Sequence, residues 1–487
     1  MLGMDSDSLY AAYKSKDPRF DGRFFIGVSS TRIYCRPICR ARTAKQKNCT
    51  FYLTAAEAEQ SGYRPCLLCR PELAPGPSIT DANNVLAYKS ARMLIENCDS
   101  NQTLDELAMR LGCTDRHLQR IFKTEYNVFP MQYLQTCRLL LAKNLLTDTS
   151  LPIVDIAMTV GFGSLQRFND LFKTHYKLSP SLLRKKISKE KNQTKDLILE
   201  LGYRPPYRFE EILSFLAARA IPGVEVIKDM QYMRTVRLID SNKNPVYGWI
   251  KVGNIPEKNA LSVTLSETLL IVLPQVLVRV SRLFDLNCDP EIVHNALSSM
   301  KDIRPNISTF GIRLPGCFNT FEMAVRAVLG QQITVKAANT LAGRLVVTFG
   351  MQVKTNIQGL THVFPSPKDF LELDKPIENY LGPLGIIKSR ARTIYELSKV
   401  MEQGSINFEF CCRPEDEIEK LLKIPGIGKW TANYIAMRTM EWTDAFLETD
   451  VGIKKALYPR LAKEMLAIAE QWRPWRSYAT IILWNSL

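Results

Sequence analysis

Histidine is scarce in this chain of 487 residues, which has only four. They are His117, His175, His294 and His362, and they form neither an HExxH motif nor a paired-histidine site. A bound metal would therefore be held mainly by cysteine. A catalytic carboxylate would have to act without an obvious histidine partner.

A membrane span and an export signal are also missing. The most apolar run, residues 265–280, is broken by Pro274 and is too short to cross a bilayer. The first eight residues are acidic and lack a basic region followed by an apolar core. We therefore expect a cytoplasmic protein with no membrane partner. Its twelve cysteines should stay reduced and act as metal ligands or buried thiols.

Charge is unevenly distributed along the chain. Lys and Arg total 64 against 49 acidic residues, a formal charge of +15. Residues 1–195 hold 29 basic and 18 acidic side chains, hence most of the excess. Such a basic part predicts a polyanionic partner, with nucleic acid favoured over a merely solvated basic surface.

The length predicts three or four domains, at roughly 100–200 residues each. We expect a multidomain α+β protein that is mostly α, with a charged linker at 185–195. The expected parts are a small cysteine-rich domain (1–76), a helical domain (80–186), an α/β subdomain (198–310) and an all-α domain (311–487), and the motifs described next assign the zinc site, the double helix-turn-helix and the helix-hairpin-helix to the first, second and fourth of them.

An internal repeat lies in the second part. Residues 103–112 are echoed 49 residues later by 152–161, and each copy is followed by a second helix, at 115–123 and 164–173. This is the helix-turn-helix pattern, and a long helix at 131–146 joins the copies. An ordinary helical hairpin is the alternative, but two copies argue against it. The second helices carry the DNA-contact candidates Arg116, His117, Gln119, Arg120, Gln166, Arg167 and Asn169.

The repeat resembles the DNA-binding domain of AraC-type transcription regulators from residue 80 to 186. The resemblance implies promoter DNA and RNA polymerase as partners, and a place near the bacterial nucleoid.

Four cysteines form two short chelating loops. Cys35 and Cys39 are followed, after a gap of 26 residues, by Cys66 and Cys69. Paired thiolates of this kind favour tetrahedral Zn²⁺, and four unrelated buried cysteines are the alternative.

The stretches 34–42 and 62–69 closely resemble the zinc domain of the Ada family. The resemblance implies that Cys35 accepts a methyl group from a DNA methylphosphotriester, with Cys39, Cys66 and Cys69 as supporting ligands. Methylating one of four zinc-bound thiolates makes the site less negative, so we expect DNA affinity to rise. The Pro-Cys-His signature of the family's O6-alkylguanine transferase is absent.

A Pro-Gly-Ile-Gly turn at 425–428 separates two apolar helical stretches, and Asp450 follows 20 residues after Trp430. Alone, the turn would be a plain helix connection and Asp450 a helix cap. Together they match the helix-hairpin-helix pattern of base-excision glycosylases. Gly426, Gly428 and Lys429 are the expected phosphate contacts.

Residues 200–487 resemble the DNA-3-methyladenine glycosylase II (AlkA) family through 205–207, 215–219, 281–285, 314–317, 325–331 and 472–479. The resemblance implies Asp450 as the catalytic carboxylate and a base pocket made of Phe215, Gln331, Trp430, Tyr434 and Trp484. It also implies a monovalent cation on hairpin carbonyls near Leu422, Ile424 and Ile427. The expected substrates are cationic purines alkylated at N3 or N7, which aromatic faces attract.

Three positions depart from patterns within these families. Gln332, an expected DNA contact, replaces an apolar wedge, and Val451 replaces a tyrosine. Trp430 stands where bifunctional relatives have a Schiff-base lysine, so we expect a monofunctional enzyme. We therefore expect one protein that combines a sensor of DNA alkylation, a transcription activator and a DNA glycosylase. The alternatives are a regulator with an inactive glycosylase domain, and a bifunctional lyase using Lys429 or another lysine.

Overall fold

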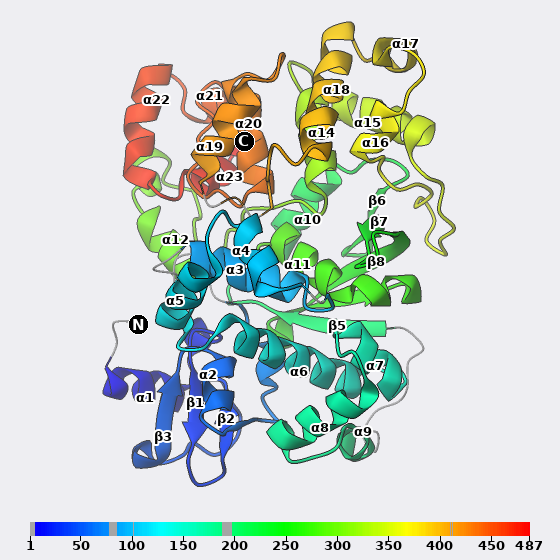
Figure 1. The fold of residues 1–487 in the computed structure, drawn as a ribbon. Coiled ribbons are helices and arrows are strands. Elements are labelled where there is room, and N and C mark those ends of the chain that lie inside the picture. Colours follow the sequence, from blue (N-terminus) through cyan, green and yellow to red (C-terminus); the bar gives the residue numbers. More distant parts are fainter. Residues whose placement is uncertain (1–4, 77–84, 101, 188–196, 410, 412) are drawn as a thin grey trace.

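The computed structural model describes residues 5–76, 85–100, 102–187, 197–409, 411 and 413–487. Figure 1 shows the N-terminal part (blue) and the repeat (cyan to teal) beside the larger C-terminal part (green to red). The expected boundaries near 77–80 and 188–196, with most of the expected linker, lie outside the described residues. No described helix is long and apolar enough to cross a membrane.

The N-terminal part is built on a four-stranded sheet with the order β3-β1-β2-β4. Its elements are α1 (Ser6–Ser15), η1 (Pro18–Phe20), β1 (Phe25–Val28), β2 (Ile33–Cys35), η2 (Gln46–Asn48), β3 (Cys49–Tyr52), α2 (Ala55–Gln60), β4 (Arg64–Pro65) and η3 (Pro71–Leu73). Strands β2 and β4 are parallel and pair Tyr34 with Pro65. This register places Cys35 and Cys66 side by side at one end of the sheet.

The described residues of the repeat form the helices α3 to α9, and both predicted helix-turn-helix units are present. The helices are α3 (Val85–Glu96), α4 (Leu104–Arg110), α5 (Asp115–Tyr126), α6 (Pro130–Asp148), α7 (Ile153–Thr159), α8 (Leu165–Tyr176) and α9 (Pro180–Ile187). The turn of the second unit depends on Gly161, whose φ is +85°. A Cβ there would lie 2.4 Å from the Cys98 carbonyl oxygen, so only glycine fits.

The third part, the expected α/β subdomain, holds a five-stranded antiparallel sheet with the order β5-β9-β8-β7-β6. The strands are β5 (Leu197–Gly202), β6 (Glu225–Lys228), β7 (Gln231–Ile239), β8 (Pro245–Ile255) and β9 (Ala260–Leu265). The helical elements of this part are α10 (Phe209–Ala217), η5 (Pro256–Lys258), η6 (Glu267–Val272), α11 (Leu273–Leu283), α12 (Pro290–Ala296) and α13 (Met300–Ile303).

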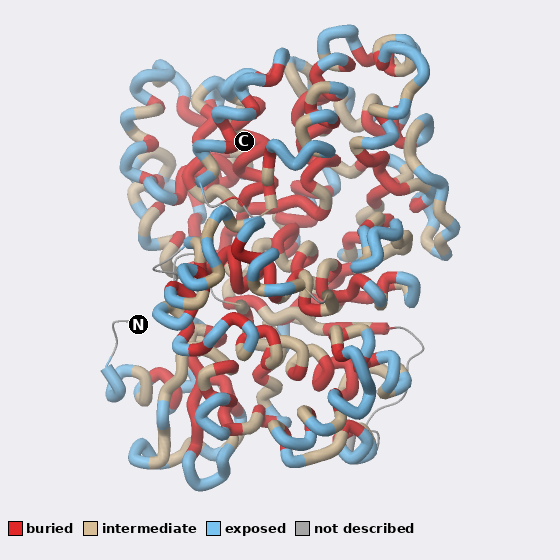
Figure 2. The backbone as a smooth tube through the Cα atoms, viewed as in Figure 1, coloured by how far each residue is buried: buried red, intermediate tan, exposed pale blue. Residues whose placement is uncertain are grey.

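The last part is helical, and its core follows α14, α20 and α23, which are buried along most of their lengths (Figure 2). Its elements are α14 (Thr320–Leu329), α15 (Val335–Phe349), α16 (Pro367–Leu371), α17 (Ile377–Leu381), η7 (Gly382–Leu384), α18 (Lys388–Glu402), α19 (Pro414–Leu422), α20 (Lys429–Thr439), α21 (Val451–Ala456), α22 (Ala462–Ala469), η8 (Glu470–Trp472) and α23 (Arg476–Asn485).

Helix α3 of the repeat packs against α11 of the C-terminal half (Figure 1). At this junction the buried carboxylate of Glu96 lies between two arginines of α11, 3.4 Å from Arg279 and 3.6 Å from Arg282. Arg92 of α3 also pairs with Glu441. The helix-turn-helix part and the C-terminal half therefore share a buried ionic interface.

Candidate active site and metal centre

Helices α19 and α20 form the predicted hairpin around residues 423–428. Gly426 has φ +89°, and a Cβ there would lie 2.1 Å from the Thr393 hydroxyl oxygen. That hydroxyl donates a hydrogen bond to the Pro425 carbonyl at 2.8 Å. Gly428 caps α20, whose first N–H groups lack partners within the helix and can bind a phosphate.

Asp450 caps α21, and three N–H groups fix its carboxylate. Oδ1 accepts from the Ile453 amide at 3.1 Å and from Trp484 Nε1 at 2.9 Å. Oδ2 accepts from Trp430 Nε1 at 3.2 Å. The carboxylate that the sequence offered as a helix cap or as an active-site acid does cap α21, and these three contacts hold it in a single orientation.

This carboxylate faces a cavity of about 1260 Å³. Small-molecule pockets usually measure about 300–1,000 Å³, so there is room for a nucleotide together with its backbone. Within the cavity wall, Trp430 stacks on Tyr434 at 5.1 Å between ring centroids. Trp484 and Gln331 line the same cavity.

Phe215 is placed differently from the other residues of the predicted pocket. It is buried and lies nearly parallel to Trp484, 6.3 Å away, but it does not belong to the described lining of the cavity. Phe215 therefore supports the wall from behind.

At the other end of the molecule, Cys35, Cys39, Cys66 and Cys69 have their sulfur atoms within 4.8 Å of one another. Tetrahedral zinc with Zn–S bonds near 2.3 Å needs sulfurs about 3.8 Å apart, so the set fits after a small contraction. Four soft thiolate donors suit Zn²⁺ better than an oxygen-seeking cation.

The chain matches four family models along its length. They are the metal binding domain of Ada over 8–72, a helix-turn-helix domain over 107–186, the AlkA N-terminal domain over 198–319, and the HhH-GPD superfamily of base excision DNA repair proteins over 325–464. One relative spans the whole arrangement. It is the probable bifunctional transcriptional activator/DNA repair enzyme AlkA of Mycobacterium tuberculosis, 34% identical over 99% of this chain and 97% of its own.

The chain belongs to this family of bifunctional AlkA proteins. It is thus a DNA-binding transcriptional activator and a DNA repair glycosylase, with a four-cysteine Zn²⁺ site. Two further relatives match parts of the chain. DNA-3-methyladenine glycosylase 2 of Escherichia coli is 35% identical over 58% of this chain and 95% of its own. The AdaA protein of Bacillus subtilis is 29% identical over 37% of this chain and 83% of its own.

In this AlkA-family chain the predicted recognition residues lie on the surface. Arg116 and Arg120 are exposed on α5, where Gln119 is half-buried, and Gln166 and Arg167 are exposed on α8. Gln166 and Arg167 also line an open groove of about 470 Å³. These side chains are free to approach a DNA groove.

A predicted DNA contact, Lys429, and a predicted base-pocket residue, Gln331, have protein partners in the structure. Lys429, which is 70% exposed, pairs with Glu448 at 3.0 Å and does not line the cavity. Gln331 donates to the Gly426 carbonyl at 2.8 Å and to the Thr431 hydroxyl at 3.0 Å, so it braces the hairpin as well. Gln332 is exposed at the cavity rim with φ +54°, and Val451 is 81% exposed.

Three arginines, at positions 219, 326 and 438, line the cavity beside Tyr434. Burial alone would raise the pKa of the Tyr434 phenol, but the three guanidinium charges outweigh it and lower that pKa. Sequence reasoning missed all three as site residues. The only sequence hint was that Arg219 and Arg326 lie in stretches that match the AlkA family.

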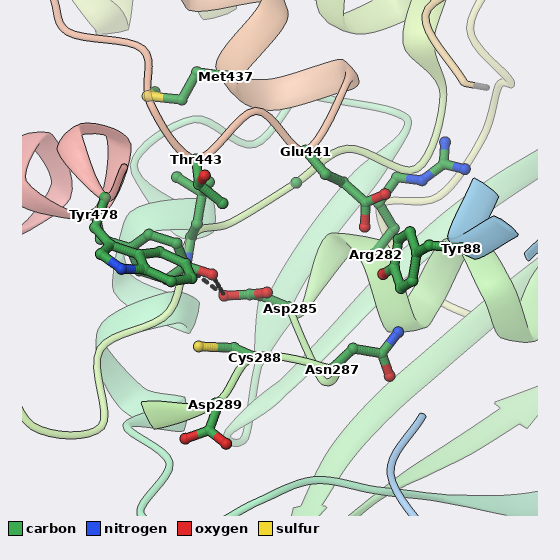
Figure 3. A pocket seen from close by; sticks show the side chains of 13 residues that line it. Tyr88, Arg282, Asp285, Asn287, Cys288, Asp289, Met437, Glu441, Thr443 and Tyr478 are labelled. Carbon is green, nitrogen blue, oxygen red and sulfur yellow. Dashed lines mark hydrogen bonds between the residues drawn. The ribbon is translucent and has the colours of Figure 1, made fainter. Parts of the chain in front are cut away.

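A second, smaller cavity lies where α3 meets the C-terminal half (Figure 3). Its volume is about 40 Å³, enough for a few waters and too small for a base. Asp285 lies within it and accepts from the Tyr478 hydroxyl at 2.8 Å, as the dashed line in Figure 3 shows. Burial raises the pKa of Asp285 to about 6, more than offsetting the nearby charge of Arg313.

We expect Asp285→Asn to change how stability depends on pH. Because the pKa of Asp285 is higher in the folded protein than its ordinary 3.8, the folded state binds the extra proton between these values. The wild type should therefore lose stability relative to Asp285→Asn as the pH rises from about 4 to 6. Urea unfolding at pH 4.5 and at pH 7 gives the free energy of unfolding of both proteins. If the wild type and Asp285→Asn differ by the same amount at both pH values, the raised pKa of Asp285 is contradicted.

Proposed function

We propose that the C-terminal half hydrolyses the N-glycosidic bond of alkylated purines of the 3-methyladenine and 7-methylguanine type. The supporting observation is the Asp450 carboxylate, fixed by two indoles and facing a cavity large enough for a flipped nucleotide. The name of the Escherichia coli relative, DNA-3-methyladenine glycosylase 2, points to the first of these bases.

The proposed reaction uses the weakness of the bond in a cationic base. A purine alkylated at N3 or N7 leaves without further protonation, so the enzyme mainly flips the nucleotide out and stabilises the sugar. As the bond breaks, Asp450 stabilises the positive charge that develops on the sugar and orients the attacking water. The hairpin N–H groups hold the neighbouring phosphate in the proposed complex.

The glycosylase reaction is proposed to be monofunctional. Trp430 donates its indole N–H to Asp450 and cannot form an imine, while Lys429 is turned to Glu448. No lysine lines the cavity among the described residues.

Borohydride treatment during turnover of methylated DNA should therefore trap no covalent complex. The full chain should still release 3-methyladenine and leave an uncleaved abasic strand. Base release and trapping are measured on the same samples, with a lyase-active glycosylase as positive control. A trapped adduct would contradict the monofunctional mechanism, and no base release at all would contradict the proposed function.

The zinc domain is proposed to repair methylphosphotriesters at Cys35. The Cys35 sulfur would attack the methyl carbon, the methyl–oxygen bond would break, and the phosphodiester would leave as an anion. A zinc ion on the four cysteines would keep the sulfur as a thiolate, which is the reactive form. Loss of one thiolate charge would then raise affinity for the DNA backbone.

Several buried contacts connect this domain to the repeat. Tyr34, next to Cys35, donates to Glu59 at 3.0 Å, and Glu59 also accepts from Thr136 of α6 at 3.1 Å. Arg70, next to Cys69, pairs with Asp148 of α6 at 2.6 Å. These contacts support the proposal that methylation controls binding to promoter DNA, where RNA polymerase is the proposed partner.

A monovalent cation on the hairpin carbonyls of Leu422, Ile424 and Ile427 also stays a proposal. The Ile424 carbonyl already accepts from the Ile427 amide at 3.1 Å, which leaves one lone pair for a cation.

A further inference from the structure

Arg219 lines the cavity that Asp450 faces, and no carboxylate of the described residues pairs with it. Its guanidinium carbon lies 3.7 Å from the centroid of Phe215 and 5.8 Å from that of Trp484. Its Nη1 donates to the Phe215 carbonyl at 3.2 Å, near the C-terminal end of α10. Arg219 takes part in none of the ion pairs found among the described residues.

The other two arginines of the cavity are held by partners. Arg326 pairs with Glu225 and with Glu322, each at 3.0 Å. Arg438 is buried and donates to the carbonyls of Pro315 and Gly316, at 2.6 and 2.8 Å. The charge of Arg219 therefore acts on the contents of the cavity more strongly than the charge of Arg326, which two carboxylates neutralise.

The positive charge of Arg219 can distinguish two classes of base, because a departing base is either neutral or negatively charged. When the glycosidic bond breaks, the electron pair stays on the base nitrogen, so the base gains one unit of negative charge. A cationic alkylpurine becomes neutral, whereas a neutral purine becomes an anion. A cation in a wall shielded from water stabilises the second transition state much more than the first.

The position of Arg219 also affects binding of a cationic base. Its guanidinium lies over Phe215, which stands behind the cavity wall, and close to Trp484, a ring of the wall that would otherwise attract such a base. Like charges then repel while the cationic base is bound. The cavity wall is consequently less selective for cationic bases than its aromatic residues alone suggest.

We propose that Arg219 is a specificity-determining residue that extends base release to neutral purines carrying a keto oxygen. Its guanidinium stabilises the negative charge that gathers on such a base as the bond breaks. The sugar cation is captured by water, which loses a proton, and the anionic base takes up a proton after release. This inference rests on the proposed glycosylase function and on the position of Asp450 in the same cavity.

The test uses the full chain and two duplexes that differ at one position, 7-methylguanine in one and hypoxanthine, a neutral keto purine, in the other. Rates are measured at DNA concentrations below saturation, for the wild type, Arg219→Gln and Arg219→Lys. In Arg219→Gln the preference for 7-methylguanine over hypoxanthine should rise about 10-fold or more, because hypoxanthine release falls. Arg219→Lys keeps the charge and should keep the wild-type preference.

Three results would overturn the proposed role of the Arg219 charge. The first is an equal loss of the release rate on both duplexes in Arg219→Gln, and the second is an Arg219→Lys variant that behaves like Arg219→Gln. The third is a wild type that releases 7-methylguanine but no hypoxanthine. A wild type that releases neither base refutes the proposed function instead. Melting temperatures of the three proteins show whether a variant is folded.

Discussion

Asp450→Asn should lower the release of 3-methyladenine by about 10²–10³-fold or more while leaving DNA binding intact. The substitution removes the negative charge that stabilises the developing sugar cation. It keeps the shape of the side chain and an oxygen that can accept from the Ile453 amide, so α21 keeps its cap. Base release under single-turnover conditions and gel-shift binding to abasic DNA measure the two effects.

Two variants separate charge from structure. Asp450→Ala removes the cap as well and should additionally cost about 1 kcal/mol of stability. Asp416→Asn makes the same charge change on an exposed side chain of α19 and should release base like the wild type. Undiminished release by Asp450→Asn would show that another group performs the chemistry.

Cys35→Ala should abolish methyl transfer from phosphotriester-containing DNA, whereas Cys49→Ala should still accept one methyl group per chain. Cys49 is a half-buried cysteine of the same sheet and is not one of the four clustered thiols, so it matches Cys35 as a control. Mass spectrometry of the digested protein locates the methyl group. Its appearance on Cys39, Cys66 or Cys69 would contradict the assignment.

The methylated protein from that reaction should bind promoter DNA more tightly than the unmethylated protein. The difference should shrink as salt rises, because screening lengths fall to about 8 Å near physiological ionic strength. Log K of both forms should fall by about 0.9 per phosphate contacted in each decade of salt. Equal binding of the two forms at low salt would show that methylation does not control DNA binding, and the zinc domain would then act in repair alone.

Local patterns in the sequence were enough to predict the helix-turn-helix units, the four-cysteine cluster and the hairpin with Asp450. Each of these depends on spacing within a short segment. Cys35 and Cys66 lie close together because β2 and β4 pair in parallel, and the chelating spacing anticipated that closeness. Spacing alone could not decide between a helix cap and a catalytic acid at Asp450; the structure shows the cap, and the catalytic role stays a proposal.

The arginines of the cavity could not be predicted in the same way. Arg326 is neutralised by Glu225, about one hundred positions away in the chain, whereas Arg219 forms no ion pair within the described part of the chain. Whether a guanidinium is paired depends on how distant segments pack, which periodicity does not encode. The contact between Glu96 and the two arginines of α11 could not be predicted from the sequence for the same reason.

That junction limits how the family can exchange its parts during evolution. A glycosylase half transferred to another activator would leave Arg279 and Arg282 without the carboxylate of Glu96. Glu409 of the same half, 2.9 Å from Arg279 and 3.9 Å from Arg282, would then be the remaining carboxylate beside them. Removing one partner of a buried ion pair typically costs about 3–5 kcal/mol, a large share of a domain's stability. A glycosylase half that works without the helix-turn-helix part would have to neutralise or replace these arginines in another way, so substitutions on the two faces of the junction are expected to be coupled.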